Sequence, residues 1–417
     1  MSMNDTPSGE RIHIGFFGRR NAGKSSIVNA VSGQQLSVVS SVKGTTTDPV
    51  YKSMELLSLG PVVIIDTPGF DDEGALGTLR VRRTRQILNK ADCAVLVVDA
   101  ALGKTEADEE MIQLFRQRKL PYLVVYNKLD LLSKDSAEAS EEHAGQPGGP
   151  EPSILVSAKA GLNILQLKER IAALLPSGGP SRPLVRDLLH PGDFVMLVIP
   201  IDDSAPKGRL ILPQQQMIRD ILEAGAVSIA VRDTELAAAL KSLKDRSGIR
   251  PAMVITDSQA FGPVSTIVPE SIPLTSFSIL MARYKGFLEP AVRGVRAIED
   301  LRDGDRILIS EGCSHHRQCE DIGTVKIPAW LLKHTGKSLR FEATSGRDFP
   351  EDLSPYRLII HCGGCMLNSR ELLYRQKCAE DAKIPFTNYG ITIAYLKGIL
   401  KRSLAPFPGL QGMLSNH

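Results

Sequence analysis

Cysteine and histidine side chains gather in the last quarter of the sequence, where their spacing could serve metal chemistry. Five of the six cysteines lie there, and three of the eight histidines stand among them in the sequence, close to a cysteine. Thiolates and imidazoles are ligands of zinc and of iron–sulfur clusters, and in a reducing compartment such cysteines indicate metal binding or reactivity rather than disulfides. The residues are Cys313, His315, His316, Cys319, His361, Cys362, Cys365 and Cys378.

Most of these residues fall into two short motifs. Cys313-Ser-His315 follows the apolar run RILIS, and His361-Cys362-Gly-Gly-Cys365 begins at the end of the apolar run RLIIH. If the two runs are neighbouring parallel strands, the loops after them meet at one edge of the sheet. The glycines then let the chain turn so that three thiolates face one centre. A Cys₃His zinc site and a 4Fe-4S cluster with an exchangeable fourth ligand both fit this spacing.

A second chemical motif lies near the N-terminus. The stretch from Gly18 to Ser25 has the P-loop pattern, and it follows an apolar run and precedes a helical pattern. Backbone N–H groups of such a loop surround phosphate oxygens. Lys24 is expected to reach the β- and γ-phosphates, and the Ser25 hydroxyl to bind Mg²⁺. The expected nucleotide-binding residues of this loop are Gly18, Asn21, Ala22, Gly23, Lys24, Ser25 and Ser26.

Further elements of a nucleotide site follow in order. Hydroxyl groups of Thr45, Thr46 and Thr47 lie in the loop where one can complete the Mg²⁺ shell, and we assign Thr46 this role. The run VVIID ends in Asp66-Thr-Pro-Gly69, which places Asp66 near the metal and the Gly69 N–H near the γ-phosphate. We therefore expect catalysis to rest on Lys24, Thr46, Asp66 and Gly69.

Two later motifs indicate which base is bound. Asn127-Lys128-Leu-Asp130 follows the run YLVVYN, and Asp130 can accept both N–H groups of guanine while Lys128 lies along the base. Ser157-Ala158-Lys159 follows the next run and can contact the guanine carbonyl through backbone N–H groups. Adenine offers the wrong donors, and an unpaired buried group can discriminate by about 10⁴–10⁵. The predicted ligand is GTP with Mg²⁺.

The elements that position these motifs predict an α/β protein of three domains. From 11 to about 175, strand-like runs alternate with helices, as in a parallel sheet with crossovers. The stretch after Leu132 is polar and reads as a surface loop, and PSGGPSRP reads as a linker. We predict a P-loop GTPase domain over 1–178, a small α/β dimerisation domain over 184–270 and an α/β cluster-binding domain over 271–417.

Bulk properties exclude several classes of protein. The net charge of +3 gives no nucleic-acid footprint, and the basic stretch Leu79–Arg85 is interpreted as the solvated face of a switch helix. The start MSMNDTPSGE has no apolar signal region, and no apolar run approaches the about 20 residues that span a bilayer. The expected protein is cytoplasmic and binds neither membrane nor nucleic acid.

The nucleotide motifs resemble those of the TrmE–Era–EngA group of GTPases over residues 11–175. Phe70 follows Asp66-Thr-Pro-Gly69 where Ras-like enzymes carry a water-orienting glutamine, so that catalytic group is missing. Asn21 matches the asparagine that binds potassium in relatives activated by this ion. The resemblance implies slow GTP hydrolysis that is stimulated by K⁺.

The combination of both motif sets resembles the HydF family, the maturation GTPases of FeFe hydrogenases, over essentially the whole chain. This resemblance implies that Cys313, Cys362 and Cys365 hold a 4Fe-4S cluster with one exchangeable iron site. His361 is the first candidate for the fourth ligand, and His315 and His316 are the others. The protein would then be a homodimeric or larger scaffold that receives the two-iron precursor with the help of HydE and HydG and delivers it to the apo-hydrogenase HydA.

Two other functions stay open on the sequence. A tRNA-modification GTPase explains the nucleotide motifs but not the thiols, and a GTPase switch with a structural Cys/His zinc site explains both. Cys319 and Cys378 match no motif position and are expected to be spare or buried thiols, and Cys93 lies in an apolar run and is expected to be inert.

Overall fold

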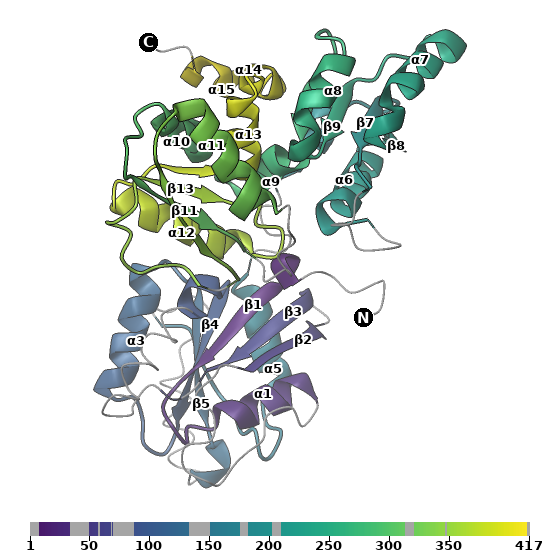
Figure 1. Ribbon diagram of the computed structural model, residues 1–417. Coiled ribbons are helices and arrows are strands. Elements are labelled where there is room, and N and C mark those ends of the chain that lie inside the picture. Colours follow the sequence, from purple (N-terminus) through teal and green to yellow (C-terminus); the bar gives the residue numbers. More distant parts are fainter. Residues whose placement is uncertain are drawn as a thin grey trace. The chain divides into compact units, whose positions relative to one another are not determined.

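The computed structural model places the chain in two compact units, Met1–Pro180 and Ser181–His417. It describes residues 8–33, 50–56, 59–67, 69, 87–132, 151–175, 182–201, 210–312, 321–346 and 348–414. Both units consist of mainly parallel sheets flanked by helices, so the predicted α/β class is confirmed (Figure 1).

The first unit is built on a six-stranded sheet with the order β2-β3-β1-β4-β5-β6. All neighbours pair in parallel except β2, which runs antiparallel to β3 at the edge. Sequence reading missed β2 because its alternating polar residues differ from the apolar runs of the central strands. The strands are β1 (Ile12–Phe17), β2 (Val50–Leu56), β3 (Gly60–Asp66), β4 (Cys93–Asp99), β5 (Tyr122–Asn127) and β6 (Ser153–Leu155).

The central strands of this sheet are buried on both faces. One hydrophobic cluster contains Ile14 and Phe16, and a separate cluster contains their neighbour Phe17. A strand that packs on both faces needs apolar residues at every position, which explains the continuous runs in the sequence. The α-helices that the structure describes over their full length in this unit are α1 (Lys24–Ser32), α3 (Glu106–Gln117) and α5 (Ile164–Ala173).

The second unit begins with a four-stranded parallel sheet of order β10-β9-β7-β8. Its last strand lies beyond residue 270, where the sequence suggested a domain boundary. The strands are β7 (Phe194–Val198), β8 (Val227–Val231), β9 (Met253–Thr256) and β10 (Leu274–Ser276). The helices are α6 (Leu212–Glu223), α7 (Leu236–Ser247) and α8 (Phe261–Ile267).

A second four-stranded parallel sheet of the same unit has the order β12-β11-β13-β14. It consists of β11 (Arg306–Ser310), β12 (Arg340–Thr344), β13 (Leu358–His361) and β14 (Phe386–Asn388). The helices are α9 (Phe277–Lys285), α10 (Leu288–Gly294), α11 (Ile327–Thr335), α12 (Ser369–Asp381), α13 (Tyr389–Leu396), α14 (Leu400–Ser403) and α15 (Pro408–Gln411).

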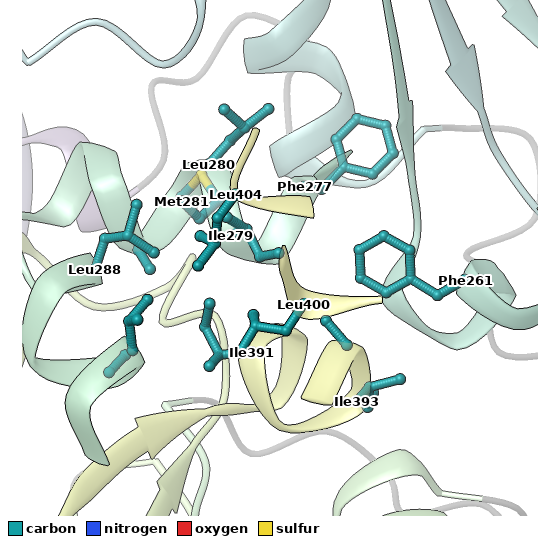
Figure 2. Close-up of a cluster of buried hydrophobic side chains, with 14 of the residues drawn as sticks. Phe261, Phe277, Ile279, Leu280, Met281, Leu288, Ile391, Ile393, Leu400 and Leu404 are labelled. Carbon is teal, nitrogen blue, oxygen red and sulfur yellow. The ribbon is translucent and has the colours of Figure 1, made fainter. Parts of the chain in front are cut away.

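The two sheets of the second unit share one hydrophobic core. Figure 2 shows Phe261 of α8 and Phe277 of α9 gathered with Ile391 of α13 and Leu400 of α14, all of them buried. Helix α9 therefore packs between elements of the middle section and elements of the last section. The division of these sections at residue 270 stays a prediction.

Within the described ranges, no helix combines the length and the apolar character needed to cross a membrane.

Candidate functional site

The loop between β1 and α1 adopts backbone angles that suit glycine. Gly18 and Gly23 have φ of 147° and 89°. A Cβ on Gly18 would lie 2.3 Å from the carbonyl oxygen of Val97, and one on Gly23 would lie 2.2 Å from Nδ2 of Asn127. Only glycine fits these positions without a shift of the strand backbone at Val97 or of the Asn127 side chain, and helix α1 begins directly afterwards at Lys24.

The Lys24 side chain lies across this loop. Its Nζ donates to the carbonyl oxygens of Gly18 and Arg19, at 2.6 and 2.7 Å, and the residue is buried. These two contacts hold the ammonium group beside the backbone that would surround a phosphate chain. A bound nucleotide can replace the carbonyl oxygens with phosphate oxygens, which are stronger partners because they are charged.

Two further residues converge where Mg²⁺ is expected. The hydroxyl of Ser25, on the first turn of α1, donates to Oδ2 of Asp66 at 2.8 Å. Asp66 ends β3, and the Thr67 hydroxyl fixes this strand end to β1 through the carbonyl oxygen of Phe16 at 2.7 Å. A hydroxyl next to a carboxylate offers the hard oxygen atoms that Mg²⁺ prefers. Gly69 is half-buried, and Thr45, Thr46 and Thr47 lie outside the described residues.

The base-recognition motifs lie beside the P-loop, joined by Asn127. Its Nδ2 donates to the carbonyl oxygen of Ala22 at 3.1 Å, and its Oδ1 accepts the backbone N–H of Ala158 at 3.1 Å. This buried amide therefore fixes the P-loop and the Ser157–Lys159 turn to the end of β5. The sequence identified Asn127 as a site residue but did not predict this bridging role.

Asp130 is exposed and ready to accept N–H groups. It accepts the Ser157 hydroxyl at 2.5 Å, and this hydrogen bond lowers the pKa of the carboxyl below its ordinary value. The acid is thus ionised at neutral pH, as guanine recognition requires. Lys128 reaches back to Asp99 at the end of β4, with 2.6 Å between Nζ and Oδ2.

Sequence reading missed two acidic partners of this site. Asp99 holds Lys128, and its place at the end of an apolar strand, like that of Asp66, was a usable signal. Asp108 of α3 is fully buried and forms an ion pair with Arg19 of the P-loop, with 3.3 Å between Nε and Oδ2. No local pattern marks that contact, because it joins segments distant in sequence.

The cysteine motif of the second unit lies at the carboxyl end of two neighbouring strands. Strands β11 and β13 pair in parallel with Ser310 opposite His361, which is the condition under which the two loops meet at one edge. The Sγ atom of Cys362 accepts the backbone N–H of Gly312 at 3.0 Å and that of Gly364 at 3.4 Å. The residue that precedes Cys313 is therefore in contact with the Cys362 sulfur.

Cys365 lies in the turn that follows. Gly364 has a left-handed φ of 67°, and the N–H of Leu367 closes the turn by donating to the Gly364 carbonyl at 3.0 Å. Burial raises the pKa of the Cys365 thiol to about 11, the nearby Cys362 adds to the rise, and Lys285 opposes it. The turn thus brings a second sulfur to the same edge in a poorly hydrated position.

His361 already has partners at both ring nitrogens. Its Nδ1 lies 2.8 Å from the carbonyl oxygen of Cys362, and its Nε2 lies 3.3 Å from the Arg375 guanidinium. A carbonyl can only accept and a guanidinium can only donate, so Nδ1 carries the proton and Nε2 accepts. His361 is fully buried, and to ligate a metal it would have to exchange one of these contacts.

Arg375 of α12 is a buried cation that the sequence analysis did not identify. It donates to Ser310 Oγ at 3.3 Å, to the Gly346 carbonyl at 2.8 Å and to Glu371 Oε1 at 2.8 Å. Together with its contact to His361, these bonds connect the ends of β11 and β13, the loop after β12 and helix α12. Arginines are mostly exposed, so its position within a charged helix gave no sign of burial.

The remaining predicted thiols and imidazoles divide into two groups. Cys93 is buried in β4 and Cys378 is half-buried on α12 against the hydrophobic core, as expected. The others, Cys313, His315, His316 and Cys319, lie outside the described residues. Among the described residues alone, no three His, Cys, Asp or Glu side chains gather closely enough to hold a metal ion.

Comparison with known proteins adds family matches for all three sections of the chain. Residues 13–128 match the 50S ribosome-binding GTPase family. Residues 184–286 match the hydrogen maturase F dimerization domain, and residues 289–406 match the hydrogen maturase F tetramerization domain.

Two relatives that match the first unit are GTPases. A GTPase Der of Wolinella succinogenes is 38% identical over 174 residues, which cover 40% of this chain and 36% of that protein. A tRNA modification GTPase MnmE of Desulfotalea psychrophila is 33% identical over 155 residues, which cover 37% of this chain and 32% of that protein. The chain thus spans about a third of the length of these relatives.

The P-loop geometry, with Lys24 and the Ser25–Asp66 pair, agrees with a GTPase domain that binds GTP and Mg²⁺. The two sections after it match domains that are named for association into dimers and tetramers, so the chain forms homo-oligomers. The order of a GTPase domain, a dimerization domain and a tetramerization domain places the chain in the HydF family of hydrogenase-maturation GTPases.

Proposed function

We propose that the protein is a GTP-hydrolysing scaffold that holds a 4Fe-4S cluster and carries the two-iron precursor of the FeFe-hydrogenase active site. The supporting observation is the contact between the Gly312 N–H and the Cys362 sulfur at 3.0 Å. It starts the Cys313 loop beside Cys362, and the tight turn at Gly364 holds Cys365 at the same edge. Cys313 follows Gly312 directly in the sequence, and we infer that its thiol joins those of Cys362 and Cys365 at one centre.

The residues fit an iron–sulfur cluster in their chemistry. The Cys362 sulfur accepts two backbone N–H groups, an arrangement that stabilises a thiolate and tunes the potential of a cluster. Cys313, Cys362 and Cys365 would hold the cluster, and His361, His315 or His316 would supply the fourth ligand. When bound, the cluster would offer an exchangeable iron site, which suits a carrier because its cargo must bind and leave.

GTP hydrolysis would rest on residues of the first unit. Lys24 and the loop N–H groups bind the β- and γ-phosphates, Ser25, Thr46 and Asp66 position Mg²⁺, and the Gly69 N–H contacts the γ-phosphate. The exposed Asp130 carboxylate and the Ser157–Lys159 turn recognise guanine.

We expect slow turnover that K⁺ stimulates through Asn21. This residue has a left-handed φ of 61° within the P-loop and is exposed. GTPase rates of wild type and Asn21→Ala, compared in KCl and in NaCl, test this expectation. Equal rates of the wild type in the two salts would remove Asn21 from the proposal.

Nucleotide state is expected to govern partner exchange. In GTPases the γ-phosphate and Mg²⁺ hold the switch segments, which relax on hydrolysis. We propose that the segments at 45–47 and 69–85 report this state to HydE, HydG and HydA. Equal affinity for these partners in the GTP, GDP and nucleotide-free states would refute the coupling.

Anaerobic reconstitution tests the cluster. Reduced wild-type protein should give the EPR signal of a 4Fe-4S cluster, and Cys313→Ser, Cys362→Ser and Cys365→Ser should each lose most of it. Cys378→Ser is the matched control, since its half-buried thiol on α12 has no proposed ligand role. Stoichiometric zinc without iron in the wild type would instead indicate a structural zinc site, and a signal unchanged in all three variants would refute the ligand set.

A further inference from the structure

Asp108, in the first turn of α3, is a fully buried carboxylate of the first unit. Acidic side chains are almost never buried to this degree unless they are paired. Its Oδ2 atom accepts two hydrogen bonds from Thr105, one from the backbone N–H at 3.0 Å and one from the hydroxyl at 2.8 Å. These bonds belong to the capping box at the start of the helix, and they involve only one of the two carboxylate oxygens.

The Arg19 guanidinium approaches the same carboxylate from the P-loop, with 3.3 Å between Nε and Oδ2 of Asp108. Arg19 directly follows Gly18, and its backbone carbonyl accepts Nζ of Lys24 at 2.7 Å. The side chain of Arg19 therefore contacts α3, while its backbone forms part of the loop that would surround a phosphate chain. A displacement of this guanidinium would move the carbonyl oxygen that the Lys24 ammonium group contacts.

The other oxygen of the Asp108 carboxylate is a second acceptor for this guanidinium. Oδ1 is buried and accepts no hydrogen bond from any residue that the structure describes. A buried polar atom without a partner is rare in native proteins and calls for a specific reason. A guanidinium presents its N–H groups as a planar fork that matches both oxygens of a carboxylate. Arg19 already lies at Oδ2, so it can add a second bond at Oδ1 when the loop closes around phosphate.

The segment that ends in Asp108 also contacts the guanine-recognition motif. It begins at Asp99, the last residue of β4, and the Oδ2 atom of Asp99 lies 2.6 Å from Nζ of Lys128. Residues 99–108 are thus attached to the base-recognition motif at one end and to the phosphate-binding loop at the other, through two separate ion pairs. Because the pairs are separate, substitutions can distinguish their effects on phosphate binding and on base binding.

We propose that Asp108 is a positioning residue of the GTPase site, which acts through Arg19 to hold the P-loop in the shape that binds the β- and γ-phosphates. This inference concerns the GTPase domain and does not depend on the proposed cluster. Little water screens a pair whose carboxylate is buried, so the attraction between the two charges is strong. If the loop without this pair keeps its productive shape about a tenth of the time, its apparent affinity for a phosphate chain falls about tenfold.

The test compares the affinities of the full chain for GDP and for GMP, measured by competition with a fluorescent guanine nucleotide. GMP lacks the β-phosphate that the P-loop and its lysine contact, so the ratio of the two affinities isolates phosphate binding by the loop. Asp108→Asn removes the charge at constant size, and Arg19→Gln breaks the pair from the side of the loop. Each should lower the ratio of GDP affinity to GMP affinity about tenfold.

GTP hydrolysis and the double variant provide further readouts. In both single variants KM for GTP should rise by a similar factor while kcat at saturating GTP stays unchanged, because the ground state and the transition state lose the same binding. The variant that carries both Asp108→Asn and Arg19→Gln should bind GDP no more weakly than the weaker single variant, because both changes break one pair. Additive losses would show that Asp108 does not act through Arg19.

Two variants of the same segment are matched controls. Glu106→Gln removes an equal charge from the same turn of α3, but Glu106 is exposed, so the ratio of GDP affinity to GMP affinity should equal that of the wild type. Asp99→Asn weakens the contact to Lys128 in the base-recognition motif. It should lower the affinities for GDP and GMP by the same factor, because both ligands carry guanine, and should leave their ratio unchanged.

Thr105→Val separates positioning of the P-loop from capping of α3. It removes the hydroxyl bond to Asp108 but keeps the Arg19 pair, so it should lower the unfolding temperature without changing the ratio of GDP affinity to GMP affinity. A ratio that falls as far in Thr105→Val as in Asp108→Asn would assign the effect to the helix start and overturn the proposal. A wild-type ratio in Arg19→Gln would also overturn it, and this variant decides alone if Asp108→Asn does not fold.

Discussion

The buried pair of Arg375 and Glu371 tests how the ends of β11 and β13, beside Cys362, are stabilised. Arg375→Met removes a guanidinium that is 1% exposed and that donates to Ser310, Gly346 and Glu371. Truncation of one member of such a buried pair costs about 3–5 kcal/mol, because the other charge stays buried without its counterion. If the free energy of unfolding falls by about 2 kcal/mol per molar urea, the urea concentration at the unfolding midpoint should decrease by about 1.5–2.5 M.

The single tryptophan of the chain makes this measurement specific. Trp330 lies on α11 of the second unit, so its fluorescence reports the unfolding of that unit in the presence of the GTPase domain. The double variant Glu371→Leu with Arg375→Met should recover part of the loss, since apolar residues can replace a buried pair.

An exposed pair with the same spacing is the matched control. Arg293 and Glu289 on α10 are also four residues apart, with 3.1 Å between Nη2 and Oε1, but their side chains are 64% and 49% exposed. Arg293→Met should therefore change stability by no more than about 0.5 kcal/mol. A loss of less than about 1 kcal/mol in Arg375→Met, or a double variant that is less stable than the single one, would refute the reasoning.

Three further predictions follow from the two sites. Asn127→Ala removes two hydrogen bonds that are together worth about 1–3 kcal/mol. GDP affinity, measured by fluorescence titration, should therefore fall about 5- to 150-fold. An unchanged GDP affinity would show that the Asn127 bridge is dispensable. The Ser157 hydroxyl lowers the pKa of the Asp130 carboxyl from its ordinary value, so the group stays charged and should leave GDP affinity constant between about pH 8 and pH 5. Ser157→Ala should raise that pKa, so that GDP affinity begins to fall at a higher pH than in the wild type. Identical pH profiles of the two proteins would show that the hydrogen bond is not the cause. Gly364→Ala forces a side chain onto a φ of 67°, so it should lower the free energy of unfolding by about 1–3 kcal/mol and lower the yield of reconstituted cluster. Gly409→Ala, where an added Cβ meets no atom within 4 Å, should match the wild type in stability and in cluster yield.

The sequence predicted those parts of the fold whose signals are local. Strands buried on both faces, such as β4 and β13, appear as continuous apolar runs, and the P-loop is marked by glycines that the backbone requires. Some edge strands were missed because packing gives them no such pattern. Both β2 and β12 carry alternating or largely exposed residues that look like loop sequence.

The motifs of the candidate sites were predictable from the sequence, but the buried charged residues that pack beside them were not. The neighbourhood of Cys362 and Gly312 follows once the two apolar runs pair as parallel strands, a pairing that the sequence allowed and the structure shows. The burial of Lys285 and Arg375 depends on helices that pack against this edge from distant parts of the chain. Charged residues in helices are usually solvated, so only the tertiary structure identifies these two cations as interior groups.

The hydrophobic core shared by α8, α9, α13 and α14 determines where the chain can be divided into fragments that fold. A fragment that begins near residue 271 would lose Phe261 and expose the apolar faces of Ile391 and Leu400 to water. Such fragments are expected to aggregate, whereas a cut near residue 180 follows the boundary between the compact units. Expression of residues 181–417 as one piece is therefore the practical route to study oligomer assembly apart from nucleotide binding.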